Sequence, residues 1–109
     1  MPGSGFFCDI SKLSAADRAR LQVVSGSLAS AGPAIDELPD GLALTFDGDR
    51  TTFQLVTEWL GYERVCCPFL DIQVRSESNG GAIVVTLTGR TGVKAFILEE
   101  FGRFMKKGG

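Results

Sequence analysis

The sequence predicts an α+β fold, a two-layer sandwich in which helices cover one face of an antiparallel sheet. Two pairs of short alternating segments have the pattern of β-hairpins, with turns at Pro39-Asp40-Gly41 and Ser78-Asn79-Gly80-Gly81. A segment with helical periodicity follows each hairpin, and a hairpin with one apolar face needs a helical layer to cover it. We therefore expect the order β-α-β-β-α-β-β-α in a single domain over 1–109, with residues 1–5 and 108–109 flexible.

The chain is expected to begin with a short strand over 6–10. Three of its side chains alternate along the segment and would share one face: Phe6, Cys8 and Ile10. A helix over 14–30 should follow, because Ser14 with Asp17 three residues later has the spacing of a capping box. The predicted strand places Cys8 on a face that points toward the core.

The two hairpins and the last helix carry regular apolar patterns. The first hairpin should pair strands over 34–38 and 42–46. The second should turn two apolar rows toward the core: Leu70, Ile72 and Val74, then Ile83, Val85 and Leu87. Thr91 is the expected N-cap of a last helix that ends at Gly108. Its apolar face should comprise Val93, Phe96, Ile97, Phe101, Phe104 and Met105.

The central helix carries the most informative pattern in the chain. It should start at a capping box formed by Thr51 and Gln54 and end just before Pro68, which disfavours helical backbone at the preceding residue. At about 100° per residue, one narrow stripe holds four side chains: Leu55, Trp59, Glu63 and Cys66. Cys66 therefore belongs to the face that packs on the sheet. Two independent periodicities thus point Cys8 and Cys66 toward the interior.

The composition excludes several classes of function. Lys and Arg number 11 and Asp and Glu number 13, so the net charge is −2. Without a basic excess, the chain is not expected to bind nucleic acid or an anionic membrane surface. It has no histidine, which excludes Ser-His-Asp catalysis, Cys-His catalysis and every histidine metal site. The first residues lack the pattern of a secretory signal, and no apolar run approaches the length of a membrane span, so a cytoplasmic protein is expected.

The chemistry available to the chain is concentrated in three cysteines, Cys8, Cys66 and Cys67. An odd number fits a secreted disulfide scaffold poorly, so thiols in a reducing compartment are expected. Adjacent Cα atoms lie about 3.8 Å apart, which is below the usual disulfide range, so a bond between Cys66 and Cys67 would be strained. Such a bond fits only at the helix end, and the reduced pair is the expected resting state.

Two or three converging thiolates suit a soft metal ion such as Cu(I) or Hg(II), which accepts few ligands. Zinc is less favoured, because it usually takes four Cys or His ligands and would need Glu63, Asp9, water or a second subunit here. The leading interpretation is therefore a soft-metal-binding thiolate protein that uses Cys66, Cys67 and Cys8. No organic cofactor is indicated, and a homodimer that shares the site is left open.

Two other functions remain open on the sequence. In the first, Cys66 or Cys67 performs thiol redox or covalent chemistry on a small thiol-reactive ligand, with Glu63 as proton acceptor. In the second, the chain is a non-catalytic interaction domain whose cysteines are small buried hydrophobes. A helix C-terminus and burial both disfavour a thiolate, whereas a bound cation stabilises it. The site therefore suits capture of a cation better than metal-free nucleophilic chemistry, and whether any reaction is catalysed is left open.

Two motifs are similar to those of a group of small uncharacterised bacterial proteins. Phe6-Phe7-Cys8-Asp9 has their F-x-C-D pattern, and the segment from Glu63 to Phe69 has their E-R-x-C-C-P-F pattern. A Gly-Gly hairpin and Leu87-Thr88-Gly89 before a closing helix extend the resemblance over nearly the whole chain. The resemblance implies that six residues form one constellation: Cys8, Asp9, Glu63, Arg64, Cys66 and Cys67. It does not identify the ligand.

Overall fold

The computed structural model describes residues 6–102, which form three α-helices and four strands in that part of the chain. The elements follow the order α1 (Ala15–Ser30), β1 (Ala34–Leu38), β2 (Gly41–Phe46), α2 (Arg50–Cys66), β3 (Asp71–Ser76), β4 (Ile83–Thr88) and α3 (Val93–Ile97). A single 3-10 turn, Ile10–Lys12, precedes α1, and a π-helical turn, Leu98–Gly102, follows α3. No helix among these residues is long and apolar enough to cross a membrane.

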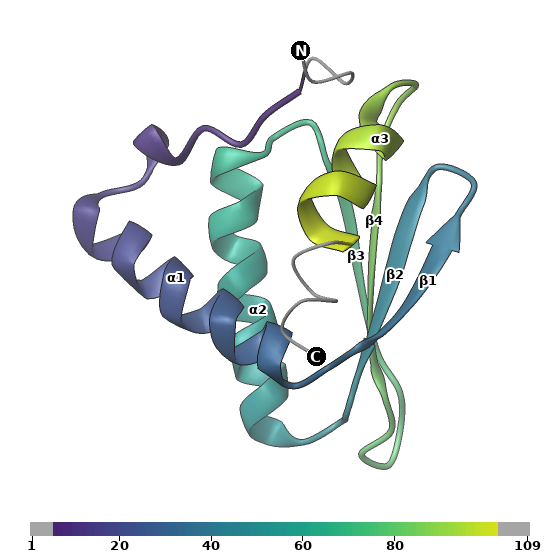
Figure 1. The fold of residues 1–109 in the computed structure, drawn as a ribbon. Coiled ribbons are helices and arrows are strands. Elements are labelled where there is room, and N and C mark those ends of the chain that lie inside the picture. The colour runs from purple at the N-terminus through teal and green to yellow at the C-terminus, as the bar shows by residue number, and fades with distance from the viewer. Residues whose placement is uncertain (1–5, 103–109) are drawn as a thin grey trace.

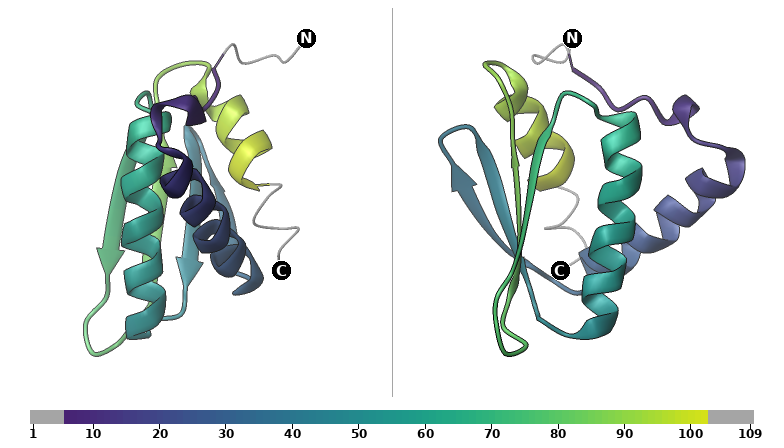
Figure 2. Two further views of the ribbon diagram at one scale, coloured as in Figure 1. Left: turned by 90° about the vertical axis from the view of Figure 1, so that its left-hand side faces the viewer. Right: turned by 180° about the vertical axis from the view of Figure 1, so that it is seen from behind.

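The strands form one antiparallel sheet in the order β1-β2-β4-β3, and the helices lie together on one of its faces (Figures 1 and 2). α2 runs along the sheet, α1 crosses α2, and α3 lies beside α2 (Figure 2). The predicted α+β two-layer sandwich with an antiparallel sheet is therefore confirmed.

The register of the sheet confirms the predicted alternation in both hairpins. Leu44 pairs with Val85, and Val85 pairs with Val74, so these side chains form one inward row across three strands. The next row joins Leu42, Leu87 and Ile72. All of the β2 and β4 members of these rows are buried, whereas Val74 is 42% exposed because it lies on an edge strand.

The predicted first strand is wrong. Residues 6–9 have no regular structure, and both Phe7 and Ile10 are exposed. The segment runs past the C-terminal end of α2 (Figure 1), where the Asp9 N–H donates a hydrogen bond of 2.8 Å to the Cys66 carbonyl oxygen. The last carbonyls of a helix lack partners inside the helix, so this end attracts a backbone donor that a sheet edge would otherwise pair. Of the three side chains predicted to face the core, Phe6 and Cys8 are half-buried, whereas Ile10 lies in the 3-10 turn and is exposed.

Two predicted helix starts are also corrected. Ser14 caps α1 as expected, since its side chain accepts a hydrogen bond from the Asp17 N–H. α2 begins earlier than its predicted capping box, because the Asp49 carboxylate accepts from the Thr52 N–H at 2.7 Å and its charge suits the helix N-terminus. Thr91 is not the cap of α3.

The N-cap of α3 is Gly92, whose φ of 94° lies in the left-handed region, and no side chain caps this helix. Within the described residues, the inward face of α3 and the turn after it matches the prediction: Val93, Phe96, Ile97 and Phe101 are buried. The predicted members Phe104 and Met105, the predicted end at Gly108 and the terminal residues 1–5 and 108–109 lie outside the described residues.

Candidate functional site

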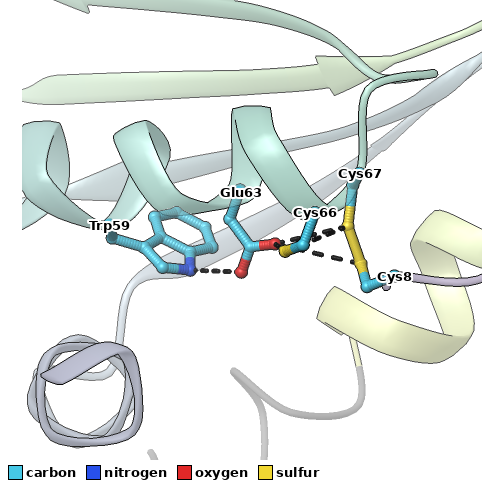
Figure 3. Close-up of a disulfide and its surroundings, with 5 residues drawn as sticks. All are labelled: Cys8, Trp59, Glu63, Cys66 and Cys67. Atoms are coloured by element: carbon cyan, nitrogen blue, oxygen red, sulfur yellow. Dashed lines mark hydrogen bonds between the residues drawn. A yellow bond between two sulfur atoms is a disulfide. The ribbon is translucent and has the colours of Figure 1, made fainter. Parts of the chain in front are cut away.

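The site is built on the last two turns of α2 (Figure 3). Trp59, Glu63 and Cys66 follow one another along the buried face of the helix, as the predicted stripe requires. Glu63 is only 7% exposed and is the one buried charged residue in the described chain. The Trp59 indole Nε1–H donates a hydrogen bond of 2.8 Å to Glu63 Oε2, which orients the carboxylate and leaves Oε1 facing the cysteines.

α2 ends at Cys66, and the backbone changes direction at Cys67. Its backbone has φ −126° and ψ 64°, outside the helical region, as expected for a residue that precedes proline. Its N–H still donates to the Glu63 carbonyl oxygen at 2.7 Å, so the change of direction occurs at a fixed point. Two consecutive residues of a regular helix cannot both face one site, and the helix end allows Cys67 to do so together with Cys66.

Cys8 reaches the same place from the N-terminal segment. The hydrogen bond from the Asp9 N–H to Cys66 anchors the segment on one side of Cys8. On the other side, the rings of Phe6 and Phe69 pack with their centroids 5.0 Å apart. The convergence of Cys8, Cys66 and Cys67 is thus as predicted, although a loop, and not a strand, delivers Cys8.

The structure adds a pairing that was not predicted. Cys8 and Cys67 form a disulfide that joins Cα atoms 4.7 Å apart, and Cys66 is a free, buried thiol. The Cys66 and Cys67 sulfurs lie 3.9 Å apart and are not bonded, so no vicinal disulfide forms (Figure 3). The Cα separation disfavours the vicinal pairing: Cys8 and Cys67 lie within the range of disulfides, whereas neighbouring residues lie below it.

Glu63 is the common neighbour of the three sulfurs. Its Oε1 lies 3.4 Å from the Cys67 sulfur, 3.6 Å from the Cys66 sulfur and 3.9 Å from the Cys8 sulfur. One donor atom from each of these four residues lies within 4.8 Å of all the others, so the group is close enough to hold one metal ion. Since disulfide sulfurs are not thiolates, the full ligand set exists only after Cys8–Cys67 is reduced.

Burial controls the protonation of the site. It raises the pKa of Glu63 to about 7, although the Trp59 hydrogen bond opposes this shift; the charge of Glu100 adds to it. Burial also raises the pKa of Cys66 to about 12, and the neighbouring Glu63 carboxylate contributes in the same direction. At neutral pH, Cys66 is therefore a neutral thiol that donates its hydrogen bond to Glu63.

Two residues that the resemblance placed in the constellation do not join the sulfur cluster. The Asp9 carboxylate instead accepts the Ser11 N–H at 3.1 Å, and the hydrogen bonds to Ser11 lower its pKa. Its contribution to the site is the backbone N–H bound to Cys66. Arg64 is exposed to solvent on α2.

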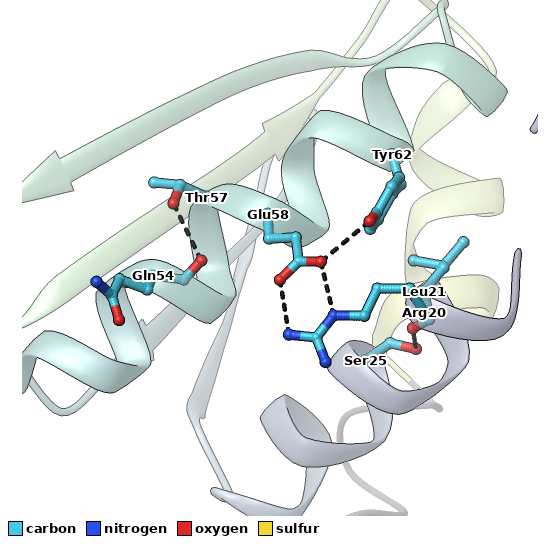
Figure 4. Close-up of polar contacts among 7 residues, drawn as sticks. All are labelled: Arg20, Leu21, Ser25, Gln54, Thr57, Glu58 and Tyr62. Carbon is cyan, nitrogen blue, oxygen red and sulfur yellow. Dashed lines mark hydrogen bonds and ion pairs between the residues drawn. The ribbon is translucent and has the colours of Figure 1, made fainter. Parts of the chain in front are cut away.

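A polar brace joins α1 and α2 (Figure 4), which the sequence does not predict. Glu58 accepts two hydrogen bonds from the Arg20 guanidinium, at 2.7 and 2.9 Å, and one from the Tyr62 hydroxyl at 3.0 Å. Only the spacing of Glu58 and Tyr62, four residues apart on one helix, was visible in the sequence. The brace joins α1 to α2 at a partly exposed position.

No family model matches the chain, and neither a curated protein nor a solved structure matches it. The donor set, three sulfurs and one carboxylate oxygen, could hold a metal ion.

Proposed function

We propose that the reduced protein captures one soft metal ion, Cu(I) or Hg(II), with Cys8, Cys66 and Cys67 as ligands. The observation that carries the proposal is the approach of three sulfurs and one carboxylate oxygen to within 4.8 Å of one another. Soft ions prefer thiolates and accept two or three of them, so the three sulfurs of this chain suffice. The cluster contains residues from two separate parts of the chain. Sequence adjacency therefore does not explain why Cys8 lies beside Cys66 and Cys67.

Glu63 distinguishes this cluster from three cysteines alone. Its Oε1 supplies an oxygen that zinc would accept as a fourth ligand, so zinc is the competitor to measure. For a soft ion, Glu63 would instead act beside the metal, as a carboxylate that receives a thiol proton from Cys66. Binding then displaces protons, and affinity for the ion should rise with pH.

The first test is retention of metal with Trp59 as reporter. Reduced protein should retain one Cu(I) or Hg(II) ion per chain through desalting, and binding should change Trp59 fluorescence because its indole is hydrogen-bonded to Glu63 beside the sulfurs. Cys66→Ser should weaken retention and reduce the fluorescence change, because only the thiolates of Cys8 and Cys67 remain as sulfur ligands. Glu63→Gln should weaken retention by about 10–100-fold, the usual effect of losing a group that supports metal ligands.

Glu58→Gln is the matched control, because it changes a carboxylate on the same helix that faces Arg20 and not the cysteines. It should retain the ion as the wild type does. Absence of retained ion in reduced protein, together with unchanged fluorescence, would refute the proposal. Stronger retention of zinc than of Cu(I) would refute its assignment to soft ions.

A second function is favoured by the disulfide itself. Cys8 and Cys67 are joined by a disulfide, and the free Cys66 sulfur lies 3.9 Å from the Cys67 sulfur. Thiol–disulfide exchange requires a free thiol next to a disulfide sulfur in this way. The raised pKa of Cys66 opposes this role, because the thiolate is the attacking species. Turnover of a soluble disulfide with a thiol reductant, lost in Cys66→Ser, would favour this redox function over metal capture.

The proposed function requires a reducing compartment. A reducing compartment such as the cytoplasm keeps Cys8 and Cys67 as thiols and therefore keeps the ligand set complete. An ion-to-chain ratio of one to two in native mass spectrometry would instead indicate a site shared by a homodimer.

A further inference from the structure

A cavity of about 160 Å³ adjoins the sulfur cluster. Cys8, Cys66 and Glu63 line one part of it. Most of the remaining wall is apolar and comes from four segments of the chain: Ile10, Leu21, Trp59 and Phe101. Cys66 thus has access to a space bounded by the N-terminal segment, α1, α2 and the π-helical turn.

The volume exceeds what a bare ion needs. A metal ion held by three thiolates is surrounded by sulfur at bond lengths near 2.3 Å. Such an ion would not fill an adjoining apolar space. Apolar walls stabilise an organic group through burial, as in small-molecule sites generally. The cavity therefore fits a ligand that has an organic part as well as a thiophilic atom.

The charge of the cavity favours a cation. Glu63 and Glu100 both line it, and no Lys or Arg does so among the described residues. Glu100 is exposed and stands at the outer part of the cavity, whereas Glu63 is buried beside the sulfurs. An anionic ligand, such as a carboxylate or a phosphate, would meet two acidic side chains and no basic partner.

We propose that this cavity holds the organic substituent of an organometal cation, R–Hg⁺ or a cation of the same class, whose metal binds the Cys66 sulfur. The inference rests on the proposed function in one respect, the use of Cys66 as a soft-metal ligand. It adds the chemical class of the ligand and assigns the apolar walls to its carbon part.

The binding step is an exchange at the metal without redox change. With R–Hg–Cl as the donor, the Cys66 S–H bond and the Hg–Cl bond break, and one Hg–S bond forms. The proton passes to the Glu63 carboxylate, whose Oε1 lies 3.6 Å from that sulfur, or to water, and chloride leaves. An organomercury cation needs only one thiolate, so the disulfide-bonded protein can bind it through its single free thiol.

This difference separates the two proposals in one experiment. Disulfide-intact protein is titrated with methyl-, ethyl- and phenylmercury chloride in competition with a soluble thiol, and only samples in which mass spectrometry shows the Cys8–Cys67 bond still closed are compared. One cation should bind per chain, and affinity relative to the soluble thiol should rise about fourfold from methyl to ethyl, the value for about 0.8 kcal/mol per buried CH₂. It should rise further with phenyl, and Cys66→Ser should abolish binding.

A matched pair of variants tests the cavity. Ser25 lines the cavity on α1, near Leu21 (Figure 4), and Ser25→Leu should remove the rise from methyl to phenyl by filling the space. Ser27→Leu places the same side chain at an exposed position of α1 and should leave the rise intact. Leu21→Ala widens the cavity and should increase the ratio of phenyl to methyl affinity, which provides a second readout if Ser25→Leu does not fold.

Equal relative affinities for methyl, ethyl and phenyl would overturn the inference, as would a rise that neither cavity variant alters. If reduced protein still retains Cu(I) or Hg(II) in that case, the proposed function stands and only the ligand class is wrong. If reduced protein retains no bare ion, the proposed function fails whatever the organomercury series shows.

Discussion

Reduction of the Cys8–Cys67 disulfide is expected to lower the free energy of unfolding by about 4 kcal/mol. The bond spans 59 positions of sequence, and chain-entropy models assign this value to a loop of that length. It also fastens the N-terminal segment to the end of α2, beside the hydrogen bond from Asp9 to Cys66 and the contact of the Phe6 and Phe69 rings. Denaturant unfolding with and without reductant measures the difference.

Two variants make this measurement specific. Cys8→Ser with Cys67→Ser should match the reduced wild type and should not respond to reductant. Cys66→Ser retains the disulfide and should lose stability on reduction as the wild type does. Equal unfolding midpoints for oxidised and reduced protein, with thiol titration showing the bond open, would contradict the expected role of the bond. A soft ion added to reduced protein should restore stability in proportion to its binding.

Stability of the metal-free protein should fall by roughly 2–3 kcal/mol between pH 5 and pH 8. Glu63 titrates at an ordinary pKa of 4.5 when unfolded but at about 7 in the fold, so the folded state binds the extra proton. Its contribution is fully present below pH 4.5 and is lost as pH rises through 7. The chain has no histidine, so few other groups titrate in this window.

Glu63→Gln should flatten the dependence on pH, because the amide stays neutral and its oxygen can still accept the Trp59 N–H. Glu58→Gln should keep the slope, since the Arg20 hydrogen bonds lower the pKa of Glu58 and hold it ionised throughout. Unfolding curves at each pH provide the measurement. A wild-type stability that is flat from pH 5 to pH 8, or an equal slope in Glu63→Gln, would show that Glu63 is not protonated in the fold.

The elements that sequence reasoning predicted well are those whose pattern repeats over several residues. The inward rows of β2 and β4 follow from strict alternation, and the buried stripe of α2 follows from helical spacing through Trp59, Glu63 and Cys66. The meeting of Cys8 with the vicinal pair was also predicted. That prediction required only that the Cys8 side chain face the core, and it does so from a loop as it would have from a strand.

The features that the sequence did not predict depend on contacts between residues distant in sequence. Alternation over 6–10 resembles a strand, but the free carbonyl of Cys66 decides what the Asp9 N–H pairs with. The choice of Cys67 as partner of Cys8 depends on a Cα separation through space, which three cysteine positions in a sequence do not contain. The cavity beside Cys66 likewise arises from packing of four segments, so no single motif reveals it.

The measurement that tests the central claim most directly is X-ray absorption at the metal edge of reduced protein loaded with Cu(I) or Hg(II) and desalted in the presence of a competing thiol. The claim predicts three sulfur neighbours per ion, falling to two in Cys8→Ser with the ion still bound by Cys66 and Cys67. A first shell that contains no protein sulfur, or complete loss of the ion to the competing thiol, would contradict capture of a soft metal by this cluster.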